Sequence, residues 1–461
     1  MLLAPGILRR RLELLPPDVR EERDGRVLLL WGNVPHWMVV DKEMDAFLLD
    51  LDGRSPLGDF IRTTGHSRRG LAGTAKDLLA IGVLHDPQSP KANPKPEREF
   101  KLENIGLNLT ARCNLRCAFC YNRDRLAASP QGEITAEEIC GFLDTAKPLT
   151  AKAASLVILG GEPFLEPRKL FTVLAHAKRL GLTSLVSTNG TLVTPELAGE
   201  ARRNRLHVQV SIDGPDANSH DSVRGPGGFD RAVAGVRHLV AARVHTVISM
   251  VCHDRNIEQL EEFFDLAVRL RVDEARFIPL KRIGAADTSG FHPVPISKLM
   301  STAYSLFKRR PEFLKFLGRD AFSVLGNTCR YSARRPSCGT GLQTVLLDAD
   351  GALYPCLNLN LPQFRIASIR DRGYDLSKIW RKSAGLRALR EDTSLDNPRR
   401  ACSRCPVRYW CLGGCRGETL ALCGDVRAPS PGCADLRRAM LDMMWVLAES
   451  PAMIRPAIKI C

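Results

Sequence analysis

Residues 104–121 read NIGLNLTARCNLRCAFCY, an apolar run that passes directly into three closely spaced cysteines. Cys113, Cys117 and Cys120 have the spacing C-x3-C-x2-C. Three thiolates on one loop are enough to bind three irons of a 4Fe–4S cluster and to leave the fourth iron open to a ligand, as catalytic metal sites do. The alternatives are a zinc site without its fourth ligand and an electron-transfer cluster completed by a distant cysteine.

The residues around this loop, from 100 to about 285, alternate apolar strands with amphipathic helices. The predicted strands are 104–110, 155–160, 183–188, 206–212, 244–251 and 275–280. The predicted helices are 135–147, 167–180, 195–204, 229–242 and 256–270. Six such strands separated by helices predict an α/β fold in which a parallel sheet curls into a partial (β/α)6 TIM-like barrel. In such folds the chemistry lies on the loops that follow the strands.

Short motifs occupy those loops. GGEP at 160–163 follows the second predicted strand, STNG at 187–190 follows the third, and SIDG at 211–214 follows the fourth. HDSVRG at 220–225 comes soon after. Together with the cysteine spacing at the end of the first strand, these motifs resemble those of the radical S-adenosylmethionine (SAM) superfamily, and the resemblance covers about residues 100–285.

The resemblance implies a chemistry. In that family the open iron binds the amino and carboxylate groups of SAM, and reduction cleaves SAM to a 5′-deoxyadenosyl radical that abstracts a hydrogen atom from the substrate. Glycine in the GGEP loop would let the backbone approach SAM, Glu162 would meet the SAM ammonium, and Arg224 would pair with the SAM carboxylate.

The resemblance also implies a set of residues. Cys113, Cys117 and Cys120 would hold the catalytic cluster. The implied SAM-binding residues are Gly160, Gly161, Glu162, Pro163, Asn189, Ser211 and Arg224, together with backbone contacts from 282–284 to adenine.

A second group of cysteines lies in the C-terminal part of the chain. A C-x12-G-x4-C pattern spans 338–356, and a C-x2-C-x5-C-x3-C run begins at Cys402. With Cys433, this ordered set resembles the seven-cysteine SPASM domain over about residues 329–440. That domain holds two auxiliary 4Fe–4S clusters, so three clusters are implied in all.

The SPASM resemblance implies interleaved ligands. The outer auxiliary cluster would take Cys402, Cys405, Cys411 and Cys433. The inner auxiliary cluster would take Cys338, Cys356 and Cys415, with Cys329 as its fourth ligand. Cys423 is the alternative to Cys433. Without Cys329, the inner cluster would have an open iron that could bind substrate.

The first 86 residues predict a separate small module. Strands at 26–31 and 35–40 surround a Gly-Asn turn, and three short helical segments follow before a proline-rich linker at 87–99. Ahead of a radical SAM barrel, this α+β, winged-helix-like module resembles the RiPP recognition element, whose relatives include the PqqD-like peptide chaperone of pyrroloquinoline quinone synthesis. The resemblance implies that the leader of a precursor peptide pairs with an exposed strand edge at 35–40 or its neighbour. A structural cap without a ligand is the alternative.

The remaining segments have less regular patterns. A helical connector is expected at 286–328, the cysteine-rich cluster-binding domain at 329–440 and a C-terminal tail at 441–461. After residue 329, only 434–449 has the periodicity of a convincing helix, so metal ligation is expected to hold this region together. Cys140 and Cys252 stand alone in apolar patterns, which predicts buried structural cysteines.

Composition limits the function classes. The chain has 461 residues and 15 cysteines, most of them clustered, which indicates metal ligation in a cytoplasmic protein. No apolar run approaches the ~18–20 residues of a membrane span. Residues 281–461 carry +14 of the net charge of +15. The few aromatic residues there disfavour nucleic-acid binding. Two clusters of about −2 each leave a positive surface that suits an acidic peptide or reductant.

These patterns predict a radical SAM/SPASM enzyme that modifies a ribosomally made precursor peptide, bound through its leader and supplied with electrons by a flavodoxin or ferredoxin-type protein. One alternative is an anaerobic sulfatase-maturing enzyme, but that group has an Asp base where this chain has Leu357. Another is a SPASM enzyme with a small-molecule substrate. From a different class, a non-catalytic iron–sulfur or zinc protein would have no need of a SAM pocket.

Overall fold

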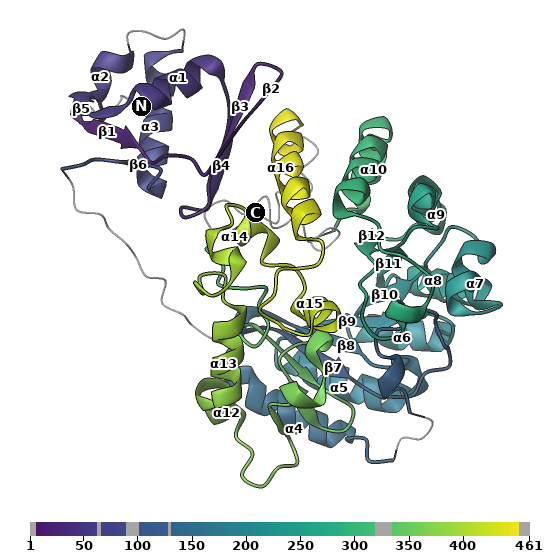
Figure 1. The fold of residues 1–461 in the computed structure, drawn as a ribbon. Helices are drawn as coiled ribbons and strands as arrows, with labels where there is room; N and C mark the ends of the chain where they lie inside the picture. Colours follow the sequence, from purple (N-terminus) through teal and green to yellow (C-terminus); the bar gives the residue numbers. More distant parts are fainter. Residues whose placement is uncertain (1–5, 62–65, 89–100, 128–130, 319–333, 451–461) are drawn as a thin grey trace.

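The computed structural model describes residues 6–61, 66–88, 101–127, 131–318 and 334–450. Most of the predicted linker, Cys329, part of the predicted connector and the end of the tail lie outside these residues. Figure 1 shows a small N-terminal module, the barrel, and C-terminal helices α14–α16 (residues 408–449) that lie between the two. No helix in the described part of the chain combines the length and the apolar character needed to cross a membrane.

A sheet of nine strands forms the centre of the molecule, in the order β12-β11-β10-β9-β8-β7-β13-β14-β15. Its six parallel barrel strands are β7 (Leu102–Asn108), β8 (Thr150–Leu159), β9 (Thr183–Thr188), β10 (His207–Ser211), β11 (His245–Cys252) and β12 (Glu274–Pro279). The six strands predicted from the sequence are thus confirmed, as is the partial barrel. The chain was not expected to extend this sheet with C-terminal strands, which are β13 (Thr344–Leu347), β14 (Ala352–Tyr354) and β15 (Ala367–Ser368).

Strand β13 runs parallel to β7, with Thr344 opposite Asn104 and Leu347 opposite Leu107. Strands β14 and β15 then continue antiparallel. This pairing joins the predicted cluster-binding domain to the strand that leads into Cys113. The two regions therefore form one continuous sheet rather than two separate bodies.

Helices cover the outside of the barrel. The predicted helices are confirmed as α4 (Ala136–Ala146), α5 (Pro167–Arg179), α6 (Pro195–Arg203), α8 (Gly228–Ala241) and α9 (Leu260–Leu270). Helix α7 (Ala217–Arg224) was not predicted, because its sequence ANSHDSVR has almost no apolar periodicity. It starts at Asp216, whose side chain accepts a hydrogen bond from the backbone nitrogen of Ser219 at 2.9 Å.

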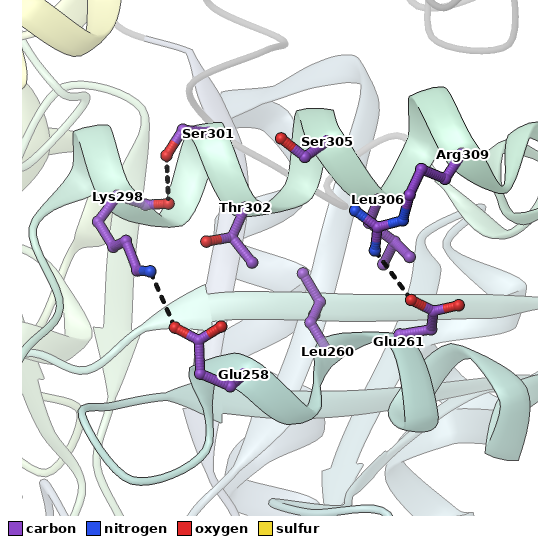
Figure 2. A pocket seen from close by; sticks show the side chains of 9 residues that line it. All are labelled: Glu258, Leu260, Glu261, Lys298, Ser301, Thr302, Ser305, Leu306 and Arg309. Carbon is purple, nitrogen blue, oxygen red and sulfur yellow. Dashed lines mark hydrogen bonds and ion pairs between the residues drawn. The ribbon is translucent and has the colours of Figure 1, made fainter.

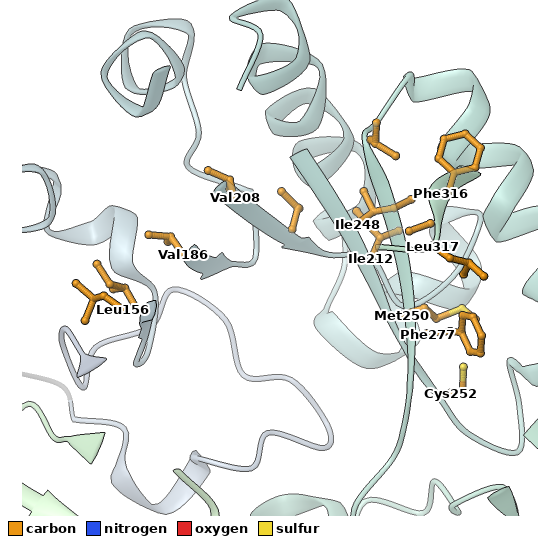
Figure 3. Packing of buried hydrophobic residues seen from close by; sticks show 14 of the residues in the cluster. Leu156, Val186, Val208, Ile212, Ile248, Met250, Cys252, Phe277, Phe316 and Leu317 are labelled. Carbon is orange, nitrogen blue, oxygen red and sulfur yellow. The ribbon is translucent and has the colours of Figure 1, made fainter. Parts of the chain in front are cut away.

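The core packs from strand to strand. Figure 3 shows Leu156, Val186, Val208 and Ile248, which come from four neighbouring strands and are fully buried. Beside β12, Phe264 stacks on Phe313 of η8 (Pro311–Phe316) with ring centroids 5.3 Å apart. This packing fixes the ends of the strands and hence the loops that carry the motifs.

The C-terminal region contains more helix than predicted. Helices α10 (Ile296–Arg309) and α16 (Cys433–Glu449) agree with the predictions. The expectation of a single helix after residue 329 was wrong, since α12 (Leu376–Lys382), α13 (Ala384–Thr393), α14 (Arg408–Cys411) and α15 (Arg416–Cys423) are also present. They are short, with four to ten residues each, and α12 and α13 begin at the capping side chains of Asp375 and Ser383.

Two isolated cysteines behave differently. Cys252 is buried as predicted, whereas Cys140 is partly exposed. The prediction for Cys140 was wrong because Ile139 and Leu143 form the buried face of α4.

The N-terminal module has two small sheets. One has the order β2-β3-β4 and the other β5-β1-β6. The predicted hairpin is confirmed as β3 and β4. The module consists of β1 (Arg11–Leu14), β2 (Val19–Arg23), β3 (Arg26–Trp31), β4 (His36–Asp41), α1 (Lys42–Asp50), β5 (Asp52–Pro56), α2 (Leu57–Phe60), α3 (Arg68–Ile81) and β6 (Leu84–His85).

Both faces of β3 are buried. Val27, Leu29 and Trp31 pack in the module's own core, whereas Leu28 and Leu30 belong to the main core of the molecule. Figure 1 shows this sheet beside α16. The module is therefore docked on the C-terminal region.

Polar contacts secure the same interface. Arg23 forms an ion pair with Asp442 of α16 at 2.6 Å, and Arg438 binds Glu21 at 3.1 Å. At the β3–β4 turn, Arg408 donates a hydrogen bond to Asn33 at 2.7 Å. These contacts hold the module next to α14 and α16, which carry two of the predicted cluster cysteines.

Candidate functional site

The C-x3-C-x2-C loop follows β7 directly, at the end of the barrel where the strands have their carboxyl termini. Its three thiols lie close enough to affect one another. Burial raises the pKa of Cys113 to about 11, with smaller increases from the charges of Glu162, Cys117 and Cys120. Arg224 donates a hydrogen bond to the sulfur of Cys117 at 3.7 Å. The loop thus gathers the three predicted ligands beside a cation.

The three thiols are the donor set of the central site. Among the described residues, no three His, Cys, Asp or Glu side chains are grouped as the ligands of one ion would be. The thiolates around a 4Fe–4S cluster bind separate irons, so they surround a wider space. The donor set of three thiols on one loop fits three corners of such a cluster.

The GGEP loop packs against the cysteine loop. A Cβ atom on Gly160 would lie 2.5 Å from the carbonyl oxygen of Thr110. A Cβ on Gly161 would overlap the carbonyl oxygen of Arg112 and lie 3.0 Å from the backbone nitrogen of Cys113. The prediction explained these glycines by an approach of the backbone to SAM. In the structure their small size is needed for contact with the loop that carries Cys113.

Glu162 joins two of the motif loops. It is buried, and its carboxylate accepts hydrogen bonds from the Thr188 hydroxyl at 2.7 Å and the Asn189 backbone nitrogen at 2.8 Å. It also accepts one from the backbone nitrogen of Phe164 at 3.0 Å. Burial raises the pKa of Glu162, and these hydrogen bonds oppose the increase. Its position next to the cysteine loop fits the implied contact with the SAM ammonium.

Asn189 lies where the sequence predicts, in the loop after β9. Its side-chain amide donates a hydrogen bond to Asn114 of the cysteine loop at 2.8 Å. Asn114 in turn donates to Thr191 at 2.9 Å. Ser211 ends β10 and lies in the same row of strand ends. The sequence analysis did not identify Asn114, although it stands directly after Cys113.

Arg224 has a partner that the sequence analysis missed. Its Nε lies 2.6 Å from a carboxylate oxygen of Asp213, which is fully buried. The other oxygen of Asp213 accepts a hydrogen bond from the backbone nitrogen of Val251 at 2.8 Å. Asp213 therefore holds the guanidinium with its Nη1 towards the sulfur of Cys117. Both residues sit in quoted motifs, but only the fold reveals that they pair.

The predicted adenine loop also reaches the cysteine loop. Gly284 has a φ of +62°, and a Cβ there would lie 2.5 Å from the carbonyl oxygen of Tyr121. The backbone nitrogen of Ala285 donates to the carbonyl oxygen of Cys120 at 3.1 Å. Residues 282–284 thus close one side of the site.

The inner auxiliary site brings together three of its predicted cysteines. Burial raises the pKa of Cys356 to about 12, and the charges of Cys338 and Cys415 also raise it. The amide of Asn358 donates a hydrogen bond to the sulfur of Cys415 at 3.3 Å. The predicted fourth ligand, Cys329, lies outside the described residues.

The four cysteines predicted to bind the outer auxiliary cluster line a small cavity. It has a volume of about 50 Å³, and its lining includes Cys402, Cys405, Cys411 and Cys433. Burial raises the pKa of Cys411 to about 12, with further increases from the other three thiols. Cys423 is exposed at the end of α15 and does not line the cavity. The arrangement favours Cys433 over Cys423 as the fourth ligand.

This difference gives a matched pair of variants. We expect Cys433→Ala to lower the iron content of anaerobically reconstituted protein by about four atoms per chain, the content of one cluster, because one corner of the outer cluster loses its ligand. Cys423→Ala should retain the wild-type iron content. Iron and acid-labile sulfide analysis measures both. The reverse pattern would assign the ligand to Cys423.

A separate surface groove of about 320 Å³ lies between α9 and α10. Figure 2 shows that ion pairs cross it, from Lys298 to Glu258 at 2.8 Å and from Arg309 to Glu261 at 2.9 Å. Its lining contains none of the predicted site residues.

Comparison with known families agrees with this geometry. The Radical SAM superfamily matches residues 107–267, and the SPASM iron–sulfur cluster-binding domain matches residues 338–406. The AdoMet-dependent heme synthase of Methanosarcina barkeri is 28% identical over 345 residues, which are 71% of this chain and 95% of that protein. The PqqA peptide cyclase of Rhizobium meliloti is 28% identical over 360 residues, 74% of this chain and 88% of that protein.

Solved structures share the fold at low sequence identity. The structure described as native anSMEcpe with bound AdoMet and Cp18Cys peptide has a TM-score of 0.62 and 16% identity, and it covers 78% of this chain and 99% of its own. The structure of Streptococcus suis SuiB bound to the precursor peptide SuiA has a TM-score of 0.60 and 14% identity. It covers 92% of this chain and 99% of its own.

The partial barrel and its three groups of thiols define an iron–sulfur protein whose central site follows the first barrel strand. The matched models show a radical SAM domain at residues 107–267 and a C-terminal SPASM domain at residues 338–406. Its cofactors are therefore SAM and 4Fe–4S clusters, one at the SAM site and the auxiliary ones in the SPASM domain.

Proposed function

We propose that this enzyme is a maturase of ribosomally made peptides. The observation that carries the proposal is the N-terminal module docked on the SPASM region. The SuiB structure covers 92% of this chain, whereas residues 100–461 make up less than four fifths of it. The structural likeness to SuiB therefore extends into the N-terminal module. One relative, the PqqA peptide cyclase, is named for a peptide substrate. Another is named as a maturase: the mycofactocin maturase MftC of Mycobacterium tuberculosis is 29% identical over 334 residues, which are 70% of this chain and 81% of that protein.

The proposed leader site is the outer edge of β4. Strand β4 is the last strand in the order β2-β3-β4, and strand addition at a terminal strand is a known mode of peptide binding. The opposite edge strand, β2, reads VREER, and such charges protect an edge from pairing. Strand β4 instead has the partly buried Met38 and Val39. We therefore assign the role of a RiPP recognition element to this module.

The residues of the central site would hold the catalytic cluster and SAM in a fixed geometry. When bound, these groups supply a 5′-deoxyadenosyl radical that abstracts hydrogen from the peptide. Cys113, Cys117 and Cys120 would ligate three irons. Glu162, held by its three donors, would orient the SAM ammonium, and Arg224, held by Asp213, would orient the SAM carboxylate. Gly160, Gly161 and Pro163 shape the loop that carries Glu162.

The auxiliary sites would handle the electron that remains after bond formation in the peptide. A flavodoxin or ferredoxin-type protein would supply electrons at the positive face of the C-terminal region, where residues 281–461 carry a net charge of +14. Attraction between opposite charges would speed this encounter and make it sensitive to salt.

The test uses the full-length protein, SAM, a reductant and a short peptide encoded beside its gene. We expect 5′-deoxyadenosine to form together with a peptide that has lost hydrogen atoms, as read by mass spectrometry. A core peptide without its leader should bind and react more weakly. The free leader added in trans should compete for the full-length peptide.

The heme synthase relatives provide the second candidate, because one of them matches over 95% of its own length. A tetrapyrrole substrate is therefore included in the same assay. If the tetrapyrrole is consumed and the peptide is unchanged, the maturase proposal is wrong. A sulfatase-maturase activity is disfavoured, since the exposed Leu357 stands where that group has its Asp base.

A further inference from the structure

Two arginines are buried in the SPASM region between the cysteine groups. Arg400 and Arg416 each have only 2% of their surface exposed. Arg416 donates to the carbonyl oxygens of Val426 and Ala428 at 2.8 Å each, and also to that of Gly413. Arg400 donates to the carbonyl oxygens of Thr393, Ser394 and Arg427. Backbone carbonyls satisfy these hydrogen bonds, but they do not neutralise the charges.

Neither guanidinium has a carboxylate partner. Among the ion pairs of the described residues, formed within 4.0 Å, none includes Arg400 or Arg416. Arg408 in the same region is different, because it lies 3.8 Å from Asp396. The Nε of Arg416 is also buried without a hydrogen-bond partner. Because burying an unpaired charge is costly, two such groups require another source of negative charge.

Cysteine sulfurs lie near both arginines, and the carboxylate of Asp425 is close enough to Arg400 that this charge helps to lower the pKa of Asp425. Arg400 donates a hydrogen bond to the sulfur of Cys402, a proposed outer-cluster ligand, at 3.5 Å. Burial and the charge of Arg400 lower the pKa of Arg416, whereas the thiolates of Cys338, Cys402 and Cys415 raise it. Arg416 therefore interacts electrostatically with thiolates of both the outer and the inner site.

The chain is shaped to enclose both guanidinium groups. Gly413 and Gly414 have φ values of +77° and +70°, and they lie between Cys411 of the outer site and Cys415 of the inner site. A Cβ on Gly413 would lie 3.1 Å from Nη2 of Arg400 and 3.8 Å from Nη2 of Arg416. The loop that connects the two sites therefore wraps around the arginines.

We propose that Arg400 and Arg416 are built-in counter-charges of the two auxiliary clusters, and that Arg416 raises the reduction potential of both. The inference rests on the cluster ligands assigned under the proposed function. A cluster with four thiolates carries a net charge of about −2, and reduction adds one electron from the external donor without breaking a bond. A fixed positive charge in a low-dielectric interior stabilises the reduced form more than the oxidised form.

The test is a redox titration of anaerobically reconstituted full-length protein, followed by electron paramagnetic resonance. In Arg416→Met, we expect the reduction equilibrium constant of each auxiliary cluster to fall about tenfold, which corresponds to ~59 mV for one electron. The potential of the cluster at Cys113, Cys117 and Cys120 should not change. Arg416→Lys keeps the charge and should restore most of the potential.

Arg390→Met is the matched control. Arg390 is another largely buried arginine of this region that donates to carbonyl oxygens, those of Gly341 and Trp380. Its replacement should lower thermal stability and leave the cluster potentials unchanged. Equal shifts in Arg390→Met and Arg416→Met would overturn the proposal, because any buried arginine would then have the same effect.

Two further outcomes separate the proposals. Unchanged potentials in an Arg416→Met protein that holds its full iron would show that the counter-charge inference is wrong while the cluster assignment stands. If Arg416→Met loses auxiliary iron, the proposal requires that Arg416→Lys retains it. Loss of auxiliary iron in both variants would mean that hydrogen bonding rather than charge holds the site. Wild-type protein without auxiliary iron would refute the cluster assignment itself.

Discussion

Replacing Cys113, Cys117 and Cys120 together by Ala should abolish the formation of 5′-deoxyadenosine from SAM. The three thiols lie on one loop, and within the described residues no other cysteine is grouped with them. The iron content should fall from about twelve to about eight atoms per chain, because one cluster of four irons is lost. Iron and sulfide analysis and a dithionite-dependent assay for 5′-deoxyadenosine measure the two effects.

The auxiliary sites provide the control for this variant. Their predicted ligands lie in the range from Cys329 to Cys433, so their thiols do not belong to the substituted loop. Their spectroscopic signals should therefore persist in the triple variant. Retained SAM cleavage would contradict the assignment of the catalytic site, and zinc in place of iron in the wild type would contradict cluster binding as a whole.

Features that depend on local pattern could be predicted from the sequence. The strands of the barrel are apolar runs bounded by turns, and the cysteine spacings are short enough to be read directly. The same rules failed for α7, because its sequence is polar and the helix depends on the Asp216 cap. They also failed for α12 and α13, which are stabilised by caps and packing rather than by periodicity.

Features that depend on tertiary contacts could not be predicted. Arg224 stood out in its motif, but its partner Asp213 is 11 positions earlier and becomes its neighbour only when α7 folds back. Arg400 and Arg416 are two of many basic residues in a positive segment, and only their burial distinguishes them. Likewise the run VLLL in β3 predicted a strand, whereas its burial on both faces shows that the module is docked on α16.

The glycines of the GGEP loop have a steric constraint that the sequence analysis did not predict. The family resemblance attributes their small size to the approach of SAM. In the structure, a Cβ atom added to Gly161 would lie against the backbone of Arg112 and Cys113, in the loop that carries the predicted cluster ligands. The two explanations predict different results for a single added methyl group.

Gly161→Ala should therefore impair the cluster itself. The new Cβ would overlap the carbonyl oxygen of Arg112, and backbone rather than a flexible side chain would have to move. A displacement of about 1 Å at a reacting centre can cost ~100-fold in rate. We expect a loss of at least that size in SAM cleavage, with an iron content lower by up to about four atoms per chain.

Gly141→Ala is the matched control, since Gly141 is an exposed residue of α4 with nothing within 4 Å of an added Cβ. It should keep full activity and gain ~0.5–1 kcal/mol of stability, because alanine favours the helix. If Gly161→Ala instead kept its iron and only raised the KM for SAM, the glycine would serve the approach of SAM. Loss of iron with the auxiliary signals intact would show that the GGEP loop acts first by fixing the backbone that presents Cys113.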